Sequence, residues 1–300
     1  MKHPNAVGGF DETPLAREIA SSADRLKSVN AAQVRRPSKT RVFTISNQKG
    51  GVGKTTTAVN MAAALAYKGL NVLVIDLDPQ GNASTALGVD HHSGVKGIYE
   101  VLTEDVALAS VTYKSPVMEN LYCVPASIDL AGAELELVTS HDQLERNLRL
   151  RKAIEAFQRD ASLELDYIFI DCPPSLGVLT INAFTAATEV LIPIQCEYYA
   201  LEGLSQLIRN VQLIQTQLNP TLQLSTILLT MFDSRTNLST QVSDEVRQHF
   251  PSQTLNSVIP RSVRVSEAPS YQQPVITYDK SSTGSLAYLE AAVELANRGA

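Results

Sequence analysis

The chain has 300 residues, of which 44% are hydrophobic, and its formal net charge is −6. This length and composition suit one large α/β domain with or without a tail, and they exclude fibrous, disulfide-stapled and disordered proteins. The acidic balance argues against a constitutive nucleic-acid binder, so any DNA-binding surface must be a local patch.

The N-terminus and the cysteines indicate the compartment. The N-terminus lacks the apolar core of a signal peptide, and no apolar run approaches the roughly 18 residues of a membrane span. Cys123, Cys172 and Cys196 lie far apart without metal-ligand spacing, and two of them are in apolar, strand-like runs. We therefore expect buried structural thiols in a soluble, intracellular protein.

Residues 1–40 differ in composition from the rest of the chain, with seven basic and four acidic residues. Thr13 followed by Pro14 is typical of a helix N-cap with proline at the first helical position. Apolar residues follow at helical spacing. We expect a flexible or partly helical basic extension, which either packs on its own domain or docks a partner.

From residue 41 onward, short apolar runs alternate with helical patterns. The run N-V-L-V-I at 71–75 is continuously apolar, as in a strand buried on both faces. Similar runs occur at 42–45, 121–125, 167–170, 190–194, 227–230 and 258–259. Helical patterns at 55–68, 143–159 and 204–218 separate most of them. The alternation predicts a single α/β domain over 41–300, a doubly wound, mostly parallel sheet with flanking helices, with ligands at the carboxyl ends of the strands.

The strongest motif is N-Q-K-G-G-V-G-K-T-T at residues 47–56, which follows a predicted strand and opens a predicted helix. Its glycines permit backbone conformations that turn N–H groups toward phosphate oxygens, and the helix start adds its positive dipole end. Lys54 is expected to reach the β- and γ-phosphates of ATP, and the Thr55 hydroxyl to ligate Mg²⁺. The expected nucleotide-binding residues are Lys49, Gly50, Gly51, Val52, Gly53, Lys54, Thr55 and Thr56.

Lys49 sets this loop apart from the usual G-x-x-x-x-G-K-[ST] pattern. Gln48 occupies the first glycine position, and the extra lysine precedes two glycines. The form K-G-G-x-G-K-T-T resembles the deviant Walker A motif of the family that contains ParA, MinD and the nitrogenase iron protein. This resemblance implies that Lys49 crosses a homodimer interface to the partner's nucleotide, where a second cation stabilises charge during phosphoryl transfer. The alternative is a solvated loop lysine.

Two predicted strands end in aspartates. Asp76 and Asp78 follow the run at 71–75, and the resemblance assigns Asp78 to orienting the attacking water and Asp76 to supporting the metal shell. Asp171 ends the run at 167–170 and precedes two prolines, which is the pattern of a Walker B aspartate that holds Mg²⁺ directly or through water. The alternative for each aspartate is to cap the turn that follows.

The region from about residue 41 to 288 looks like ParA throughout. The resemblance is densest at 76–84, 196–203, 229–233 and 259–270. In relatives, the proline and asparagine of a V-I-P-R-N-V-R segment line the adenine. Here Pro260 matches and Ser262 replaces the asparagine, so both are expected at the adenine.

A DNA-binding surface is expected on the helix at 204–218 and the loop after the run at 227–230. Apolar residues form one helical face, so Arg209 and Gln212 point away from it. Relatives carry a DNA-contacting arginine where Gln212 stands, and Arg209 is the expected substitute one turn earlier. Arg235 matches a second DNA-contacting arginine of the family. Weaker candidates are Arg247 and Lys280, and the alternative is an ordinary solvated face.

These expectations describe a ParA/Soj-type chromosome-partitioning ATPase. The resemblance implies that it dimerises with ATP, binds nonspecific double-stranded DNA on the nucleoid in the cytoplasm, and is stimulated by a ParB-type centromere-binding protein. Catalysis by Lys49, Lys54 and Asp78 waits for dimerisation, so slow hydrolysis of ATP to ADP and phosphate is expected. The basic extension is expected to aid that stimulation or to dock a polar scaffold protein.

The alternative function is a MinD-like regulatory ATPase that acts on a protein or membrane partner without DNA. A membrane-bound member should end in a basic amphipathic helix, whereas residues 288–296 are acidic and alanine-rich. We therefore expect no membrane partner. The three cysteines do not fit the cluster ligands of a nitrogenase-like reductase. For a small-molecule kinase or synthetase, the sequence shows no acceptor pocket.

Overall fold

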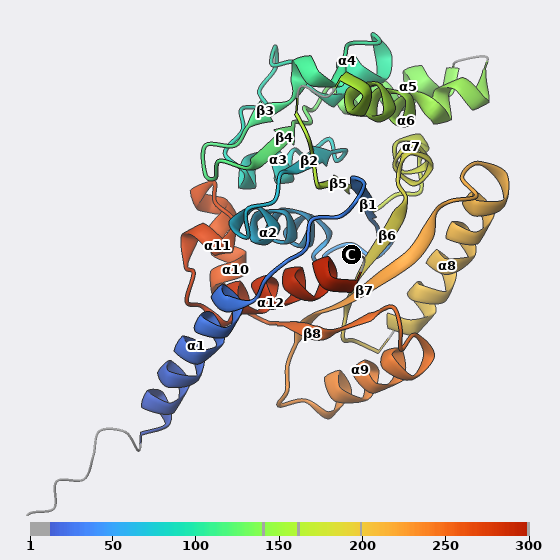
Figure 1. Cartoon of the computed structure of the whole chain (residues 1–300). Coiled ribbons are helices and arrows are strands. Elements are labelled where there is room, and N and C mark those ends of the chain that lie inside the picture. Colours follow the sequence, from blue (N-terminus) through green and yellow to red (C-terminus); the bar gives the residue numbers. More distant parts are fainter. Residues whose placement is uncertain (1–12, 140–141, 161–162, 199, 299–300) are drawn as a thin grey trace, which may run out of the picture.

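A computed structural model describes residues 13–139, 142–160, 163–198 and 200–298. In this part of the chain, eight strands form one sheet in the order β3-β4-β2-β5-β1-β6-β7-β8, and every neighbouring pair except β3–β4 is parallel. The strands are β1 (Arg41–Ile45), β2 (Val72–Asp76), β3 (Tyr113–Lys114), β4 (Leu121–Val124), β5 (Tyr167–Asp171), β6 (Glu189–Gln195), β7 (Gln223–Phe232) and β8 (Thr254–Pro260). The predicted doubly wound, mostly parallel sheet is confirmed (Figure 1).

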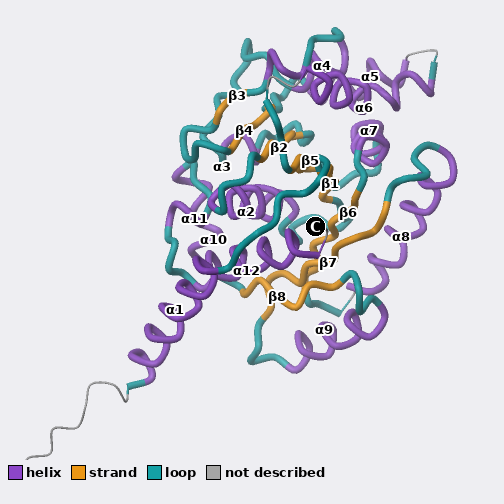
Figure 2. The backbone as a smooth tube through the Cα atoms, viewed as in Figure 1, coloured by secondary structure: helices purple, strands orange, loops and turns teal. Residues whose placement is uncertain are grey.

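Helices cover both faces of the sheet, and Figure 2 shows the strands between two helical layers. One layer comprises α1 (Pro14–Ala31), α2 (Lys54–Tyr67), α3 (Asn82–Ala86), α10 (Val263–Glu267), the 3₁₀ helix η3 (Ala268–Tyr271), α11 (Val275–Tyr278) and α12 (Thr283–Arg298). The other comprises α4 (Ile98–Thr103), the 3₁₀ helix η2 (Leu108–Val111), α5 (Leu130–Thr139), α6 (Gln143–Asp160), α7 (Val178–Ala186), α8 (Ala200–Gln217) and α9 (Asn237–His249). Each helical layer buries one face of the sheet.

The central strands are apolar throughout because both of their faces are buried. Successive side chains of a strand point to opposite sides, so Val42 joins the core beneath one layer and Phe43 joins the core beneath the other. The ring of Phe43 stacks on that of Phe169 from β5, with 5.4 Å between centroids. The continuous apolar runs in the sequence therefore reflect burial from both sides.

The sheet differs from the prediction at three places. β3 was not predicted, because a pair of residues at the sheet edge carries too little pattern to be detected. β7 begins at Gln223, four residues before the apolar run at 227–230, since its first residues are exposed or half-buried and break that run. β8 begins at Thr254, four residues before the predicted run at 258–259, since Asn256 and Ser257 interrupt the apolar pattern. None of the three differences moves the strand ends that carry the candidate site residues.

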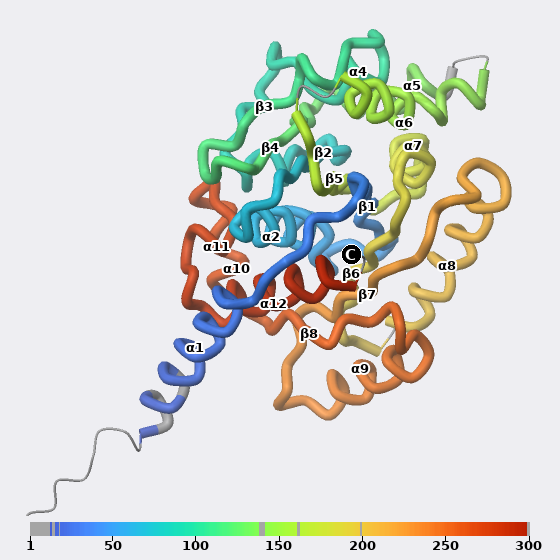
Figure 3. Tube along the Cα trace, viewed as in Figure 1, coloured from blue at the N-terminus to red at the C-terminus, as the bar shows by residue number. Residues whose placement is uncertain are grey.

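α1 occupies much of the basic N-terminal segment, of which residues 1–12 lie outside the described part of the chain. Thr13 accepts a hydrogen bond from the backbone N–H of Ala16 at 3.2 Å, so the predicted N-cap is confirmed. Near the other end of the helix, Arg25 makes two 2.8 Å hydrogen bonds to Glu290 of α12, and Val29 is buried. Figures 1 and 3 show the beginning of α1 projecting from the body.

β1, β2 and β5 end together at the carboxyl edge of the sheet, where the sequence predicted the ligand site. In the parallel register, Asp171 of β5 pairs with Ile45 of β1 on one side and with Asp76 of β2 on the other. The loop after β1, which carries the glycine-rich motif, therefore lies beside both carboxylates. The carboxyl ends of parallel strands are the usual location of ligand sites in such folds.

Candidate nucleotide-binding and hydrolysis site

The glycine-rich loop connects β1 to α2, which starts at Lys54, one residue before the predicted helical range 55–68. Gly51 and Gly53 have φ angles of +75° and +88°, a left-handed conformation that residues with a side chain rarely adopt. The amide of Thr57 donates to the Gly53 carbonyl at 2.8 Å, which starts the helix. The local backbone thus has the strand, turn and helix order that a phosphate-binding loop requires.

Long-range hydrogen bonds hold the loop in place. The side-chain amide of Asn47 donates to the carbonyl of Pro193 in β6 at 2.9 Å and accepts from the amide of Lys49 at 3.0 Å. The hydroxyl of Thr230, near the end of β7, donates to the Val52 carbonyl at 2.9 Å. Sequence reasoning missed Asn47 and Thr230 as anchors, since no spacing rule relates a loop to strands that far along the chain.

Lys54 lies at the bottom of the loop with 8% of its surface exposed. Its ammonium group lies 3.5 Å from the carbonyl oxygen of Lys49, so it remains within the loop. Burial lowers the pKa of Lys54, while the charge of Asp171 acts in the opposite direction. Thr55 and Thr56 follow it, half-buried at the start of α2. A buried cation with half-buried hydroxyls beside it fits an anionic ligand that replaces water in the loop.

Asp171 is the best-placed candidate for a metal ligand. It is fully buried, and neither of its carboxylate oxygens has a hydrogen-bond partner within the described residues. Burial raises its pKa well above the ordinary value and the charge of Asp76 adds to this effect, whereas the Thr55 hydroxyl favours the charged form. A buried carboxylate left unpaired beside a threonine hydroxyl fits Mg²⁺, whose remaining ligands are usually waters and phosphate oxygens.

Asp76, by contrast, has protein partners for both oxygens. One oxygen accepts from the backbone amide and the hydroxyl of Ser84 at 2.9 and 2.7 Å, and the other accepts from the Asp78 amide at 3.1 Å. Burial raises its pKa to about 6. The capping role that the sequence left open for Asp76 is therefore present. Its support of a metal shell stays a prediction.

Asp78 lies in the turn after β2 and is half-buried. Its carboxylate accepts from the Gln80 amide at 3.0 Å, and its carbonyl accepts from the Gly81 amide at 2.9 Å. Gly81 has a φ angle of +65°, and a Cβ there would lie 2.6 Å from a ring nitrogen of His91. The turn that carries Asp78 is thus closely packed, and its role toward water stays a prediction.

The predicted adenine-side residues lie at the end of β8. Pro260 pairs with Phe232 of β7, and the Arg261 amide donates to the Phe232 carbonyl at 3.2 Å. Ser262 is the N-cap residue of α10, and its hydroxyl would lie 3.1 Å from a Cβ at Gly284. The adenine contacts of Pro260 and Ser262 stay predictions.

The predicted DNA-facing side of α8 is exposed as expected. Its apolar face is buried, whereas Arg209 and Gln212 are exposed. Arg235 lies in the loop before α9, with 85% of its side chain exposed. It donates two hydrogen bonds to Asp233 at 2.8 and 2.9 Å, which lower the pKa of that carboxyl to about 2.

The weaker DNA candidates have partners within the chain. Arg247 donates to the carbonyl of Asn256 at 3.0 Å. The ammonium group of Lys280 lies 4.5 Å above the ring of Tyr67. Neither is therefore arranged as an unpaired surface cation.

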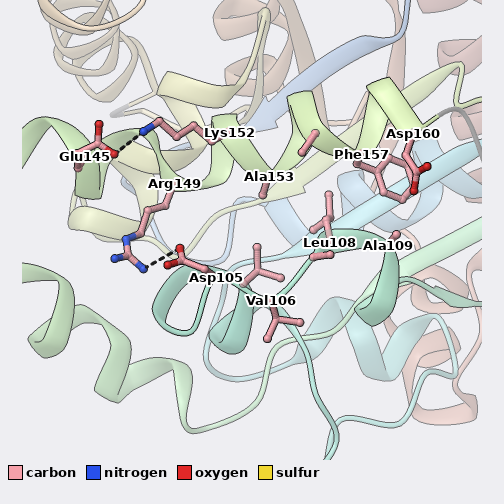
Figure 4. Close-up of a pocket in the computed structure, with 13 residues that line it drawn as sticks. Asp105, Val106, Leu108, Ala109, Glu145, Arg149, Lys152, Ala153, Phe157 and Asp160 are labelled. Carbon is pink, nitrogen blue, oxygen red and sulfur yellow. Dashed lines mark hydrogen bonds and ion pairs between the residues drawn. The ribbon is translucent and has the colours of Figure 1, made fainter.

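A cavity of about 620 Å³ lies between α6 and residues 105–109 (Figure 4). Two ion pairs border it, between Arg149 and Asp105 at 3.6 Å and between Lys152 and Glu145. None of its lining residues belongs to the glycine-rich loop or to the three aspartates. The cavity is therefore separate from the candidate nucleotide site.

Cys123, Cys172 and Cys196 are free and buried, as predicted. Within the described residues, no group of three or more His, Cys, Asp or Glu side chains is arranged to hold a metal ion. No described helix is long and apolar enough to span a membrane.

Comparison with known proteins finds close relatives over most of the chain. A family model described as an AAA domain (AAA_31) matches residues 40–224. The sporulation initiation inhibitor protein Soj of Bacillus subtilis is 51% identical over 86% of this chain and 99% of its own length. The chromosome partitioning protein ParA of Myxococcus xanthus is 50% identical over 86% of this chain and 88% of its own length.

A solved structure supports nucleotide and magnesium binding by this fold. Cobyrinic acid a,c-diamide synthase from Mycobacterium smegmatis, with a bound ATP analog and magnesium, superposes with a TM-score of 0.67. It is 38% identical, and the match covers 80% of this chain and 92% of that one. The bound groups are those predicted for the glycine-rich loop and Asp171.

Proposed function

Because this chain belongs to the Soj/ParA family of chromosome-partitioning ATPases, we propose that it is an ATP-dependent DNA-segregation protein. In this proposal it binds ATP with Mg²⁺, dimerises, binds nonspecific double-stranded DNA, and hydrolyses ATP to ADP and phosphate when a ParB-type partner stimulates it. It acts in the cytoplasm on the nucleoid. One observation carries the proposal: a buried lysine ends a positive-φ glycine loop beside a buried, unpaired aspartate.

Each part of the site has a role in this proposal. The backbone amides of residues 50–53 and the ammonium group of Lys54 hold the phosphates. Thr55 and Asp171 hold Mg²⁺, which when bound neutralises charge on the β- and γ-phosphate oxygens. Asp78 orients the attacking water, and Lys49 reaches the phosphates of the second protomer's nucleotide. Since the chain supplies positioning and charge without covalent chemistry, turnover is slow until a partner improves the geometry.

The DNA role rests on exposed arginines. Arg209 lies on α8 and Arg235 lies in the loop that precedes α9, and these two helices contact each other. Dimerisation doubles this pair, which allows a basic surface on a chain whose net charge is −6. Arginine contacts to phosphates give binding that is independent of sequence and falls steeply with salt.

The rival function is a MinD-like ATPase that acts on a protein or membrane partner without DNA. α12 argues against membrane contact through that helix, because its apolar face is buried against α2 and β8. A small-molecule transferase is also less well supported, since the cavity beside α6 includes no residue of the glycine-rich loop.

Co-sedimentation with nonspecific duplex DNA tests the proposal, using no nucleotide, ADP or ATP, with Asp78→Ala to trap the ATP state. Binding that requires ATP and fades with salt is the expected result. The double variant Arg209→Ala, Arg235→Ala should lose this binding. Arg151→Ala removes a half-buried arginine from α6, on another part of the molecule, and serves as the control. Absence of DNA binding under every condition, with ATP hydrolysis intact, would contradict the DNA role and leave the rival function.

For residues 1–40 we propose a partner-facing role, in ParB-type stimulation or in docking a polar scaffold. Arg25 and Val29 attach α1 to the rest of the chain, so a deletion should spare them. Removing residues 1–24 is expected to reduce stimulation or polar localisation while the melting temperature and basal hydrolysis stay unchanged. If stimulation and localisation are both intact after this deletion, the role is wrong.

A further inference from the structure

Lys49, the extra lysine of the glycine-rich loop, forms an ion pair with Glu197 of the same chain. Its ammonium group lies 2.7 Å from a carboxylate oxygen of Glu197, and the side chains are 43% and 45% exposed. Glu197 lies in the C-E-Y-Y stretch that follows β6 and was assigned no role from the sequence. The pair therefore bridges the loop after β1 and the segment after β6, two adjacent parallel strands.

Both members of the pair are oriented by the end of β6. The other carboxylate oxygen of Glu197 accepts a hydrogen bond from the side-chain amide of Gln195. The backbone N–H of Glu197 donates to the Gln195 carbonyl at 2.8 Å. On the loop side, the amide of Lys49 donates to Asn47, whose own side chain is bonded to the carbonyl of Pro193. A carboxylate held by a neighbouring amide presents one fixed oxygen, so this contact is more specific than an ordinary surface pair.

The ion pair conflicts with the position that a trans role requires of Lys49. An ammonium group that bonds Glu197 on its own protomer points at its own β6 segment, and it must leave that carboxylate before it can cross to a second protomer. The γ-phosphate of the partner's nucleotide carries more negative charge than one carboxylate and can take its place. Removal of the carboxylate should therefore ease the exchange.

We propose that Glu197 is a positioning residue that holds Lys49 in cis until the nucleotide of a second protomer displaces it. This inference rests on the proposed function, because it requires ATP-dependent dimers with Lys49 acting in trans. Glu197 then sets the protein and nucleotide concentration at which dimers form. Without Glu197, Lys49 has no cis partner to leave, so dimers form at lower concentrations of protein and nucleotide.

A double-mutant cycle tests the inference, with the dimer dissociation constant measured by sedimentation velocity in Mg²⁺ and a non-hydrolysable ATP analogue. Exposed ion pairs have small energies, so each released lysine should favour the dimer by about 1.4- to fivefold. Two lysines exchange per dimer, so Glu197→Gln should lower the dissociation constant by roughly two- to 25-fold. Lys49→Ala should weaken the dimer, and adding Glu197→Gln to it should change nothing further.

Glu202→Gln is the matched control, because it removes an exposed carboxylate five residues further along the chain, in the first turn of α8. It should leave the dissociation constant unchanged. The inference is overturned if Glu197→Gln leaves the dimer unchanged or weakens it, or if its effect persists in the Lys49→Ala background. Failure of the unmodified protein to dimerise with the analogue would overturn this inference together with the proposed function, whereas a dimerising protein with no effect of Glu197→Gln overturns the inference alone.

Discussion

Replacing Asp171 by asparagine tests whether its carboxyl group, the candidate metal ligand, lowers the free energy of unfolding of the ligand-free protein. The group is fully buried without a hydrogen-bond partner within the described residues, and such a group costs about 1–3 kcal/mol when neutral and more when charged. At neutral pH the cost cannot exceed that of protonating an ordinary aspartate, about 4 kcal/mol. Asp171→Asn removes the charge at nearly constant volume, and the unpaired amide that it leaves still costs about 1–3 kcal/mol. Subtracting this cost from the ceiling of about 4 kcal/mol leaves a difference of about 1–3 kcal/mol. We therefore expect the free energy of unfolding of the ligand-free protein to rise by about 1–3 kcal/mol.

Thermal unfolding followed by far-UV circular dichroism measures this change, since the chain has no tryptophan. At this chain length 1 kcal/mol shifts the melting temperature by about 2 °C, so Asp171→Asn should melt roughly 2–6 °C higher without ligands. Mg²⁺ with ATP should then stabilise the unmodified protein and not the variant. Asp166→Asn is the control, because buried Asp166 is paired with Arg36 and the Asn71 amide and its loss should lower the melting temperature. An Asp171→Asn protein that melts no higher than the unmodified one refutes the reasoning.

Three further substitutions test the supports of the site and the fold. Thr230→Val leaves the buried Val52 carbonyl without its 2.9 Å hydrogen-bond partner. The free energy of unfolding, measured in urea, should therefore fall by about 1–3 kcal/mol. ATP should also bind more weakly, as titration calorimetry will show. Gly81→Ala forces a side chain into a +65° φ conformation 2.6 Å from His91, so phosphate release should slow and the melting temperature fall; an unchanged hydrolysis rate would contradict this. At Glu294 burial acts to raise the pKa, but hydrogen bonds from two backbone amides hold it below the ordinary value of 4.5. The ionised Glu294 carboxylate contributes its full stabilisation of the fold above that pKa, and this contribution is lost as pH falls. Glu294→Gln should therefore lower the free energy of unfolding at about pH 7 and have little effect at about pH 3, as urea unfolding at both pH values will show.

Two of the three cations with proposed intermolecular roles have acidic partners within the chain, whereas Arg209 donates to the side-chain oxygen of Gln206 at 2.6 Å. Lys49 pairs with Glu197, and Arg235 pairs with Asp233. Both partners lie close to the ends of neighbouring strands, β6 and β7. The ligand-free chain thus neutralises Lys49 and Arg235 locally, in keeping with its acidic net charge.

Sequence reasoning predicted the fold class correctly and indicated a candidate site, because both predictions depend on short-range patterns. The glycines of the loop, the start of α2 and the aspartates at the ends of β2 and β5 lie within a few residues of the features that reveal them. Buried strands read as continuous apolar runs, so most of the sheet was predicted. The short edge strand β3 and the exposed beginning of β7 were not predicted, because strand residues that are exposed on one or both faces do not form a continuous apolar run.

The sequence by itself therefore determined which backbone segments hold the candidate site, down to Lys54, Asp78 and Asp171. Only the tertiary structure decided which side chains support them. Thr230 meets Val52 and Glu197 meets Lys49 across sequence separations of 178 and 148 residues. Those contacts exist because β1, β6 and β7 are adjacent in the sheet, and strand order is set by how two helical layers pack over the whole domain. A local pattern carries no information about that order, so these partners become visible only after the chain has folded.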